Sequence, residues 1–308
     1  MQIQQGEPRL LDRVRAAIRV RHYSRRTEKA YVAWIRRFIV FHEKRHPSEM
    51  GAVEVTAFLS NLAERGVSAS TQNQALSAIL FLYGAVLGQQ LGWMNDIVRA
   101  QRPVRLPVVL SREEVAALLS RLRGTVWLMA SLMYGSGLRL MECMELRVKD
   151  VNFDRGELTI RDGKGGKDRV TMLPTALKAR LVEHFTRVKA QHEAEVTAGR
   201  GSVALPGALR AKYPNAPREW AWQWVFPATR FYVDQVTGER RRHHLHESVL
   251  QRAVKDASRA AGIARPATCH SLRHYAGSRT MPSDGRSEFG VGPKLHLETG
   301  TATRDRSA

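Results

Sequence analysis

The sequence has little cysteine, since only Cys143 and Cys269 occur among its 308 residues. They are far apart and form no Cys-x-x-Cys pair, so neither a disulfide framework nor a thiolate zinc site is indicated. The sequence also lacks a run of about 18 apolar residues, and no apolar signal core follows Met1. We therefore expect a protein of the reducing cytoplasm that is neither secreted nor membrane-spanning.

Acidic residues are scarce relative to basic ones. Lysine and arginine number 49 and aspartate and glutamate 29, which leaves a formal net charge of +20. The basic residues recur from Arg9 to Arg306, so the charge belongs to folded surfaces that can follow a long phosphate backbone. With 43% hydrophobic and 25% charged residues, most of the chain should fold, and its length favours two domains. Double-stranded DNA is the expected partner.

The first part of the chain predicts a small helical bundle over residues 10–95. Ser24 can cap a helix that Pro47 ends, a second runs from about Val53 to Arg65, and a third begins near Thr71 with Gln74 placed for a capping box. Any single arginine here is more often a solvated surface residue. As a group at one helix start, the basic side chains favour phosphate contact; they are Arg19, Arg21, Arg25, Arg26 and Lys29.

Residues 96–107 read as a basic, proline-containing linker. A second, mixed α/β and mainly α-helical domain is expected over residues 108–275. It opens with a capping box at Ser111 and Glu114, and a helix from about Val126 to Tyr134 is broken at Gly135-Ser136-Gly137. Two strands, Glu157–Arg161 and Arg169–Leu173, flank a glycine-rich hairpin turn, and two helices follow, Leu177–Glu195 and Glu247–Ala261.

Three pieces of the second domain could carry chemistry. They are Gly137-Leu138-Arg139, the hairpin with Lys164, and His270-Ser271-Leu272-Arg273. Two arginines can hold a phosphodiester through its transition state, a lysine can protonate a leaving oxygen, and a histidine can assist the attacking hydroxyl. Singly, each is more often an ordinary surface arginine, turn lysine or helix-start pair. A nucleotide-phosphate loop at residues 163–167 is disfavoured because its spacing departs from the Walker pattern.

Together these motifs resemble the tyrosine recombinase (phage integrase) family. The resemblance rests on Tyr134-Gly135-Ser136-Gly137-Leu138-Arg139 with Glu142, on Gly163-Lys164-Gly165-Gly166-Lys167-Asp168-Arg169, and on His270-Ser271-Leu272-Arg273-His274. An insertion at about residues 196–246 resembles that of integron integrases more narrowly. That similarity rests on Val203-Ala204-Leu205-Pro206, Lys212-Tyr213-Pro214-Asn215-Ala216, Trp222-Gln223-Trp224-Val225-Phe226-Pro227 and Arg241-Arg242-His243-His244.

The resemblance implies a C-shaped DNA clamp, made of an α-helical core-binding domain and a mixed α/β catalytic domain, which acts as a homotetramer without a cofactor. Arg139 and Arg273 would hold the scissile phosphate, and Lys164 would be the general acid, with Lys167 as the alternative. His270 would assist proton transfer. Glu142 would orient the residues that contact the phosphate without contacting it itself.

The insertion implies a second kind of DNA partner. The resemblance to integron integrases implies recognition of folded single-stranded recombination sites. Flat side chains suit stacking on the unpaired bases of such sites. The candidates are Trp220, Trp222, Trp224, His243 and His244. For each tryptophan alone a core role is the commoner one. A metal site at His243, His244 and His246 is disfavoured because neighbouring arginines repel cations and no carboxylate set is evident.

The chain departs from the family pattern after Arg273. The family places a Leu-Gly-His motif and a nucleophilic tyrosine further on, whereas residues 276–308 show no helical period and no tyrosine follows Tyr275. Tyr275 lies too near Arg273 to be the nucleophile. We expect a divergent, disordered tail, retained DNA binding, absent strand cleavage and weakened tetramer assembly. The alternative is a non-catalytic DNA-binding protein that occupies recombination sites or a promoter.

Overall fold

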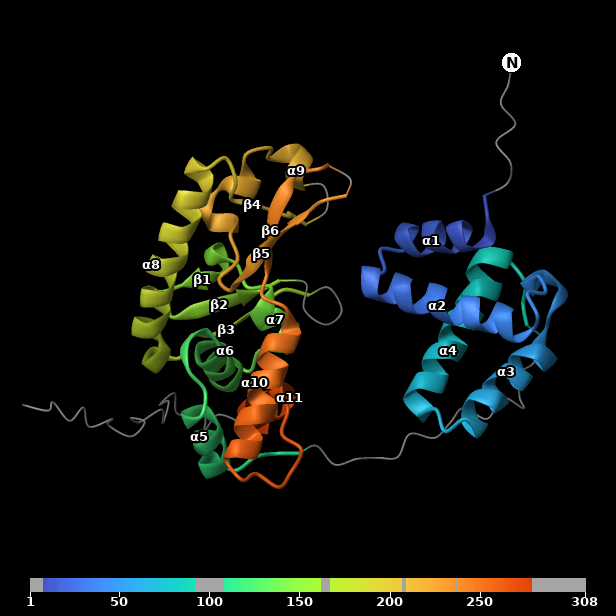
Figure 1. Ribbon diagram of the computed structural model, residues 1–308, viewed down its shortest axis with the longest axis horizontal. Helices are drawn as coiled ribbons and strands as arrows, with labels where there is room; N and C mark the ends of the chain where they lie inside the picture. The colour runs from blue at the N-terminus through green and yellow to red at the C-terminus, as the bar shows by residue number, and fades with distance from the viewer. Residues whose placement is uncertain (1–7, 92–107, 162–166, 207–208, 236, 279–308) are drawn as a thin grey trace, which may run out of the picture. The chain divides into compact units, whose positions relative to one another are not determined.

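The computed structural model describes residues 8–91, 108–161, 167–206, 209–235 and 237–278, the last five by their backbone only. The chain divides into two compact units, residues 1–105 and 106–308 (Figure 1). The predicted linker, residues 96–107, lies outside the described residues. So do residues 279–308 of the predicted tail, whereas residues 276–278 continue the last helix.

In its described residues, 8–91, the first unit is a bundle of four α-helices. They are α1 (Leu10–Val20), α2 (Arg25–Phe41), α3 (Ala52–Glu64) and α4 (Ala69–Phe81), the last continued by a π-helical turn at Leu82–Leu87. The predicted cap of α2 is confirmed, since Ser24 Oγ accepts a hydrogen bond from Thr27 N at 3.1 Å. The helices enclose an apolar core that includes Ile18, Ile35, Phe38, Phe58, Ile79, Leu82 and Tyr83.

Several sequence-based expectations for this unit were wrong. Helix α1 was not foreseen; it is a short helix that buries only Val14 and Ile18. Helix α2 ends at Phe41, well before Pro47. The cap of α4 is Ser68, whose hydroxyl accepts from Thr71 N, while Gln74 Oε1 accepts from Trp34 Nε1 at 3.2 Å and so joins α4 to α2.

The second unit combines helices with two small sheets. In chain order it contains α5 (Arg112–Ser120), α6 (Gly124–Ser136), α7 (Leu140–Met144), β1 (Val151–Asn152), β2 (Glu157–Ile160), β3 (Arg169–Met172), α8 (Thr175–Thr197), β4 (Ser202–Val203), α9 (Leu209–Lys212), β5 (Pro227–Val233), β6 (Arg240–His244), α10 (Glu247–Ala260) and α11 (Cys269–Ser278). The first sheet has the antiparallel order β1-β2-β3, and the predicted hairpin is confirmed by pairing of Ile160 with Arg169. The second has the order β4-β6-β5 and was not predicted.

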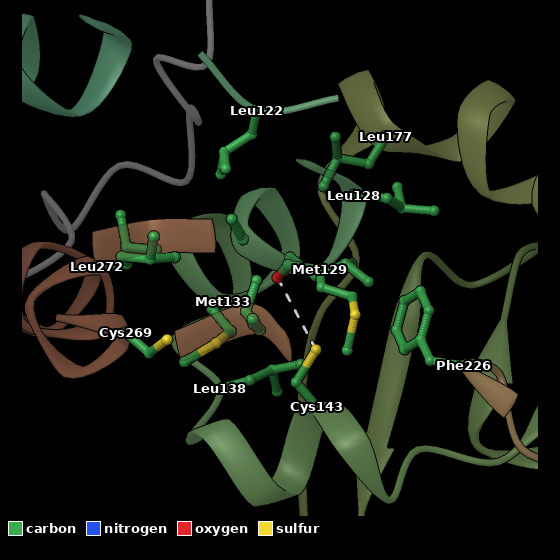
Figure 2. Packing of buried hydrophobic residues seen from close by; sticks show 14 of the residues in the cluster. Leu122, Leu128, Met129, Met133, Leu138, Cys143, Leu177, Phe226, Cys269 and Leu272 are labelled. Atoms are coloured by element: carbon green, nitrogen blue, oxygen red, sulfur yellow. Dashed lines mark hydrogen bonds between the residues drawn. The ribbon is translucent and has the colours of Figure 1, made fainter. Parts of the chain in front are cut away.

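Helix α6 runs through the centre of the second unit. Its side chains are mostly apolar on all sides, as expected of a buried helix, and it packs against α5, α8, α10 and α11. Figure 2 shows Met129 and Met133 of this helix in the buried cluster. Both cysteines lie in this core as free thiols, and burial raises the pKa of Cys269 to about 11. The predicted site residues at α7 and α11 are therefore attached to one packed body.

The glycines after α6 position the start of α7. The helix ends within the predicted segment Gly135-Ser136-Gly137, as expected, and its last residue is Ser136. A Cβ at position 135 would lie 2.5 Å from Pro174 Cγ, which explains the glycine there. Gly137 ends the helix with a φ of 64°, in the left-handed region that glycine adopts readily. The chain then turns and places Arg139 at the N-cap of α7. No described helix is both long and apolar enough to cross a bilayer.

Candidate functional site

The carboxylate of Glu142 lies at the centre of a cluster of guanidinium groups. Its side chain is only 8% exposed. Oε1 accepts from Arg139 Nη1 at 2.6 Å and from Arg169 Nη1 at 2.8 Å, while Oε2 accepts from Arg139 N at 2.7 Å and from Arg169 Nη2 at 2.6 Å. A carboxylate has about four acceptor positions, so these four bonds fill it.

The charge state of Glu142 follows from these contacts. Burial works to raise the pKa of this carboxyl, but the hydrogen bonds from Arg169 and from the backbone and side chain of Arg139 lower it to about 2. Glu142 is therefore ionised at neutral pH. It fixes Arg139 through two bonds and Arg169 through a two-point ion pair.

Arg273 reaches the same carboxylate from α11. Its Nη1 lies 3.6 Å from Glu142 Oε2, which is an ion-pair distance but too long for a hydrogen bond. Within the described part of the chain, this buried nitrogen has no hydrogen-bond partner. Burial lowers the pKa of Arg273, and the positive charge of Arg139 lowers it further. A buried donor without a partner is costly, so this group favours an anionic acceptor.

The arrangement leaves an excess of positive charge. Three guanidinium groups, those of Arg139, Arg169 and Arg273, surround one carboxylate whose acceptor positions are filled by two of them. The structure thus brings together the two arginines that the sequence motifs paired, and it adds a third. An anion with several oxygens, such as a phosphate, suits the remaining donors.

The structure describes some of the other predicted site residues. His270 is exposed on α11 three residues before Arg273, a spacing that puts both side chains on neighbouring positions of the helix surface. Lys164 lies outside the described residues. Lys167 is exposed two residues before Arg169. Tyr275 belongs to α11, but its side chain also lies outside the described set.

A groove of about 730 Å³ joins this cluster to the insertion within the second unit. Its lining includes Arg139 and Glu142 at one part, and Arg147, Lys149 and Trp222 at another. Trp222 of the insertion and, from the cluster, Arg139 and Glu142 therefore border one hollow surface.

Arg147 attaches the insertion to the rest of the unit. The residue is 6% exposed, and its Nη1 and Nη2 donate to the carbonyl oxygens of Trp222 at 2.6 Å and Ala204 at 2.8 Å. Its guanidinium carbon lies 3.8 Å from the centroid of the Trp224 ring, a cation–π contact. Burial lowers the pKa of Arg147 to about 10, so it stays charged at neutral pH.

The predicted base-stacking residues divide into buried and accessible ones. Trp224 is 7% exposed, donates from Nε1 to Arg242 O at 3.3 Å, and packs against Arg147, so it serves the core of the insertion. His244 is buried too. Trp222 is half-buried with Lys149 Nζ 3.1 Å from its ring centroid, and His243 is exposed and stacks on Trp224. Trp220 is half-buried beside His192. Accessible flat surface is thus offered by Trp222 and His243.

The basic residues of the first unit also differ from one another. Arg25, Arg26 and Lys29 are exposed in the first turns of α2. Arg19 instead forms a two-point ion pair with Glu28, at 3.0 and 3.1 Å. Exposed cations at a helix N-terminus are placed to meet phosphate together with backbone N–H groups.

Sequence reasoning assigned no role to Arg169. It appears in the quoted hairpin motif, but its partner Glu142 lies far away in the chain, and no spacing pattern reports such a pair. The signal available was only a basic residue opening the strand after the glycine-rich turn. Among the described residues, no group of three or more histidine, cysteine, aspartate or glutamate side chains is arranged to hold a metal ion.

Two family models match the chain. One, described as "Phage integrase, N-terminal SAM-like domain", covers residues 10–93, and the other, "Phage integrase family", covers residues 109–284. Proteins named "Integrase/recombinase" from Escherichia coli and Pseudomonas aeruginosa are each 49% identical over 267 residues, which is 86% of this chain and 79% of theirs. Tyrosine recombinase XerA of Pyrococcus furiosus is 31% identical over 172 residues, 53% of this chain and 56% of its own.

Solved structures share the fold at low identity. A lambda integrase tetramer bound to a Holliday junction aligns with a TM-score of 0.55 at 16% identity, over 87% of this chain and 68% of that one. The XerH site-specific recombinase bound to its palindromic difH substrate, in a post-cleavage complex, aligns with a TM-score of 0.54 at 19% identity, over 87% and 72%. The mainly helical fold with small sheets, expected from the sequence, is confirmed.

Proposed function

The chain belongs to the phage integrase family of site-specific tyrosine recombinases, and from that premise we propose that it is a recombinase of the integron-integrase type. In this proposal it binds duplex DNA and folded single-stranded recombination sites in the cytoplasm. The arginine cluster around Glu142 receives the scissile phosphate. DNA binding is retained, and strand cleavage is not completed by this chain alone.

One observation carries the phosphate-binding part of the proposal. Arg273 Nη1 is buried beside Arg139, and within the described residues it donates to no acceptor, since Glu142 is already filled by four other bonds. Arg139 and Arg273 together would grip two non-bridging oxygens and stabilise the charge of a pentacoordinate transition state. Lys164 would protonate the leaving oxygen and His270 would assist the proton transfer.

DNA binding would use both units. Arg25, Arg26 and Lys29 would contact backbone phosphates from the exposed start of α2. In the insertion, Trp222 and His243 would stack on unpaired bases of a folded single strand. Trp224 and His244 would support that surface from within, because both are buried.

The missing step is nucleophilic attack. A tyrosine recombinase needs a tyrosyl oxygen to form the covalent 3′-phosphotyrosyl bond, and no tyrosine follows Tyr275 in this sequence. Cations can stabilise charge but cannot form that bond. The second candidate is therefore a DNA-binding protein that occupies recombination sites or a promoter without chemistry, and the same observation favours it.

A nicked suicide substrate tests the two candidates. We expect the full chain to bind it without leaving a covalent protein–DNA adduct after denaturing electrophoresis, with the 49% identical Escherichia coli protein run in parallel as the comparison. An adduct formed by this chain would overturn the non-cleaving proposal and identify another nucleophile by peptide mapping. Failure to bind duplex or hairpin DNA at low salt would contradict the function as a whole.

A further inference from the structure

Arg169 is held in place from two directions. As the first residue of β3 it pairs in register with Ile160, and the strand is further tied by Thr171 Oγ1, which donates to Ser136 O at 2.9 Å. Its guanidinium meets Glu142 end-on, with 2.8 Å from Nη1 to Oε1 and 2.6 Å from Nη2 to Oε2. One residue therefore occupies an acceptor position on each oxygen of the central carboxylate.

This occupancy determines what Arg273 can do. Arg273 Nη1 is 3.6 Å from Glu142 Oε2, so it is adjacent to the carboxylate but not bonded to it. If the two positions held by Arg169 were released, Arg273 would be the neighbouring cation able to take one of them, since Arg139 already holds the other two. A guanidinium bonded to Glu142 would have fewer donors left for another anion.

We propose that Arg169 is a positioning residue for the phosphate site: by filling Glu142 it keeps Arg273 available to a phosphate oxygen. This inference rests on the proposed function of the cluster. It differs from a simple contribution of positive charge, because a lysine would supply the same charge but has a single nitrogen and cannot reproduce the two-point contact.

The experiment uses the full-length chain and inorganic phosphate as the probe. The side-chain Nε–H signals of ¹⁵N-labelled arginine are followed during a phosphate titration, and the signal of Arg273 is assigned by its disappearance in Arg273→Gln. The variants are Arg169→Lys, Arg169→Gln and the double variant Glu142→Gln with Arg169→Gln. Arg180→Gln, which removes an exposed arginine from α8, is the matched control.

We expect phosphate to move the Arg273 signal in the wild type and in Arg180→Gln with equal affinity. Arg169→Lys and Arg169→Gln should bind phosphate about tenfold more weakly, as for the removal of a charged hydrogen bond at the site. The double variant should regain most of the affinity that Arg169→Gln lacks, because the competing carboxylate is gone. Backbone amide spectra establish that each variant is folded, and Arg169→Lys alone decides if the glutamine variants do not fold.

Two results would overturn the inference by itself, and a third would overturn it together with the proposed site. If Arg169→Lys binds phosphate as tightly as the wild type, Arg169 contributes charge only. If the double variant is no better than Arg169→Gln, Glu142 does not compete for Arg273. If the wild-type Arg273 signal does not respond to phosphate at all, the proposed phosphate site itself fails and the inference falls with it.

Discussion

Arg273 Nη1 lies 3.6 Å from Glu142 Oε2, within ion-pair distance but beyond hydrogen-bond distance. All four acceptor positions of the carboxylate are taken by Arg139 and Arg169. The ion pair holds Arg273 near its neighbours without using its donors. A carboxylate that organises cations in this way prepares a site for a second anion, and the phosphate of a DNA backbone is the anion that the family membership indicates.

Removal of Arg273 should weaken DNA binding because one backbone phosphate is then no longer neutralised. For Arg273→Gln we expect about a 5- to 100-fold decrease in affinity for duplex DNA, and a slope of log K against log salt that is shallower by about 1. Fluorescence anisotropy across a salt series measures both. Arg180→Gln removes the same charge from an exposed position and should change neither by as much. Equal effects of the two variants would count against a specific phosphate contact.

Glu142 should make the second unit sensitive to acid. Its pKa is about 2 in the folded chain against an ordinary 4.5, so its contribution to stability is present above about pH 4.5 and is lost as the pH falls toward 2. The full contribution is about 3 kcal/mol by linkage. Urea unfolding at pH 7 and pH 3 should show Glu142→Gln less stable than the wild type at pH 7, with the gap narrowing at pH 3. A gap that stays constant would mean that Glu142 does not titrate in this range; Glu183→Gln, an exposed carboxylate on α8, is the control.

Local signals in the sequence predicted local structure well. The caps at Ser24 and Ser111 and the β2–β3 hairpin follow from short-range chemistry, and the structure has all three. Strand β6 was not predicted because its arginines were expected to lie at the protein surface. Arg241 and Arg242 are buried there, neutralised by Asp234 and Glu239 in one case and by Glu195 in the other. Asp234 and Glu239 come from the turn just before β6, but Glu195 lies 47 positions away in α8. No hydrophobic periodicity therefore indicates this strand in the sequence.

The candidate site shows the same limit. Arg139, Glu142 and Arg273 were predicted from family motifs, and the structure places both arginines beside the Glu142 carboxylate. The role of Arg169 depends on a contact across 27 positions of the chain, and the burial of Trp224 depends on Arg147 and the insertion sheet. Such pairings are decided by tertiary packing. They become visible only when the fold brings the partners together.

The ion pair of Arg242 with Glu195 should matter for the stability of the insertion. It joins β6 to α8 with both side chains buried, and Arg242 Nε donates to Glu195 Oε2 at 3.0 Å. Glu195→Ala leaves a buried guanidinium without its counter-charge, so we expect a decrease of about 3–5 kcal/mol in the free energy of unfolding. Replacement of both residues by Met and Leu should cost much less. Denaturant unfolding measures the series, and a cost below about 1 kcal/mol for Glu195→Ala would show that the pair is solvated.

The exposed start of α2 should contribute unspecific affinity for DNA. Replacement of Arg25, Arg26 and Lys29 by glutamine should reduce the salt slope by about 1 for each phosphate that no longer meets a cation, and should weaken binding similarly for all duplex sequences. The control replaces Arg180, Arg187 and Lys189, three exposed residues of α8, with the same change of charge. Binding and salt slope that match between the two triple variants would argue against phosphate binding at α2.

A structure of the full chain bound to duplex DNA is the most direct test of the shared phosphate site. The account predicts one backbone phosphate whose non-bridging oxygens accept from both Arg139 and Arg273 at about 2.7–2.9 Å, with Glu142 still bound by Arg169. A complex in which Arg273 Nη1 bonds to Glu142, or in which the nearest phosphate lies away from both arginines, would contradict it.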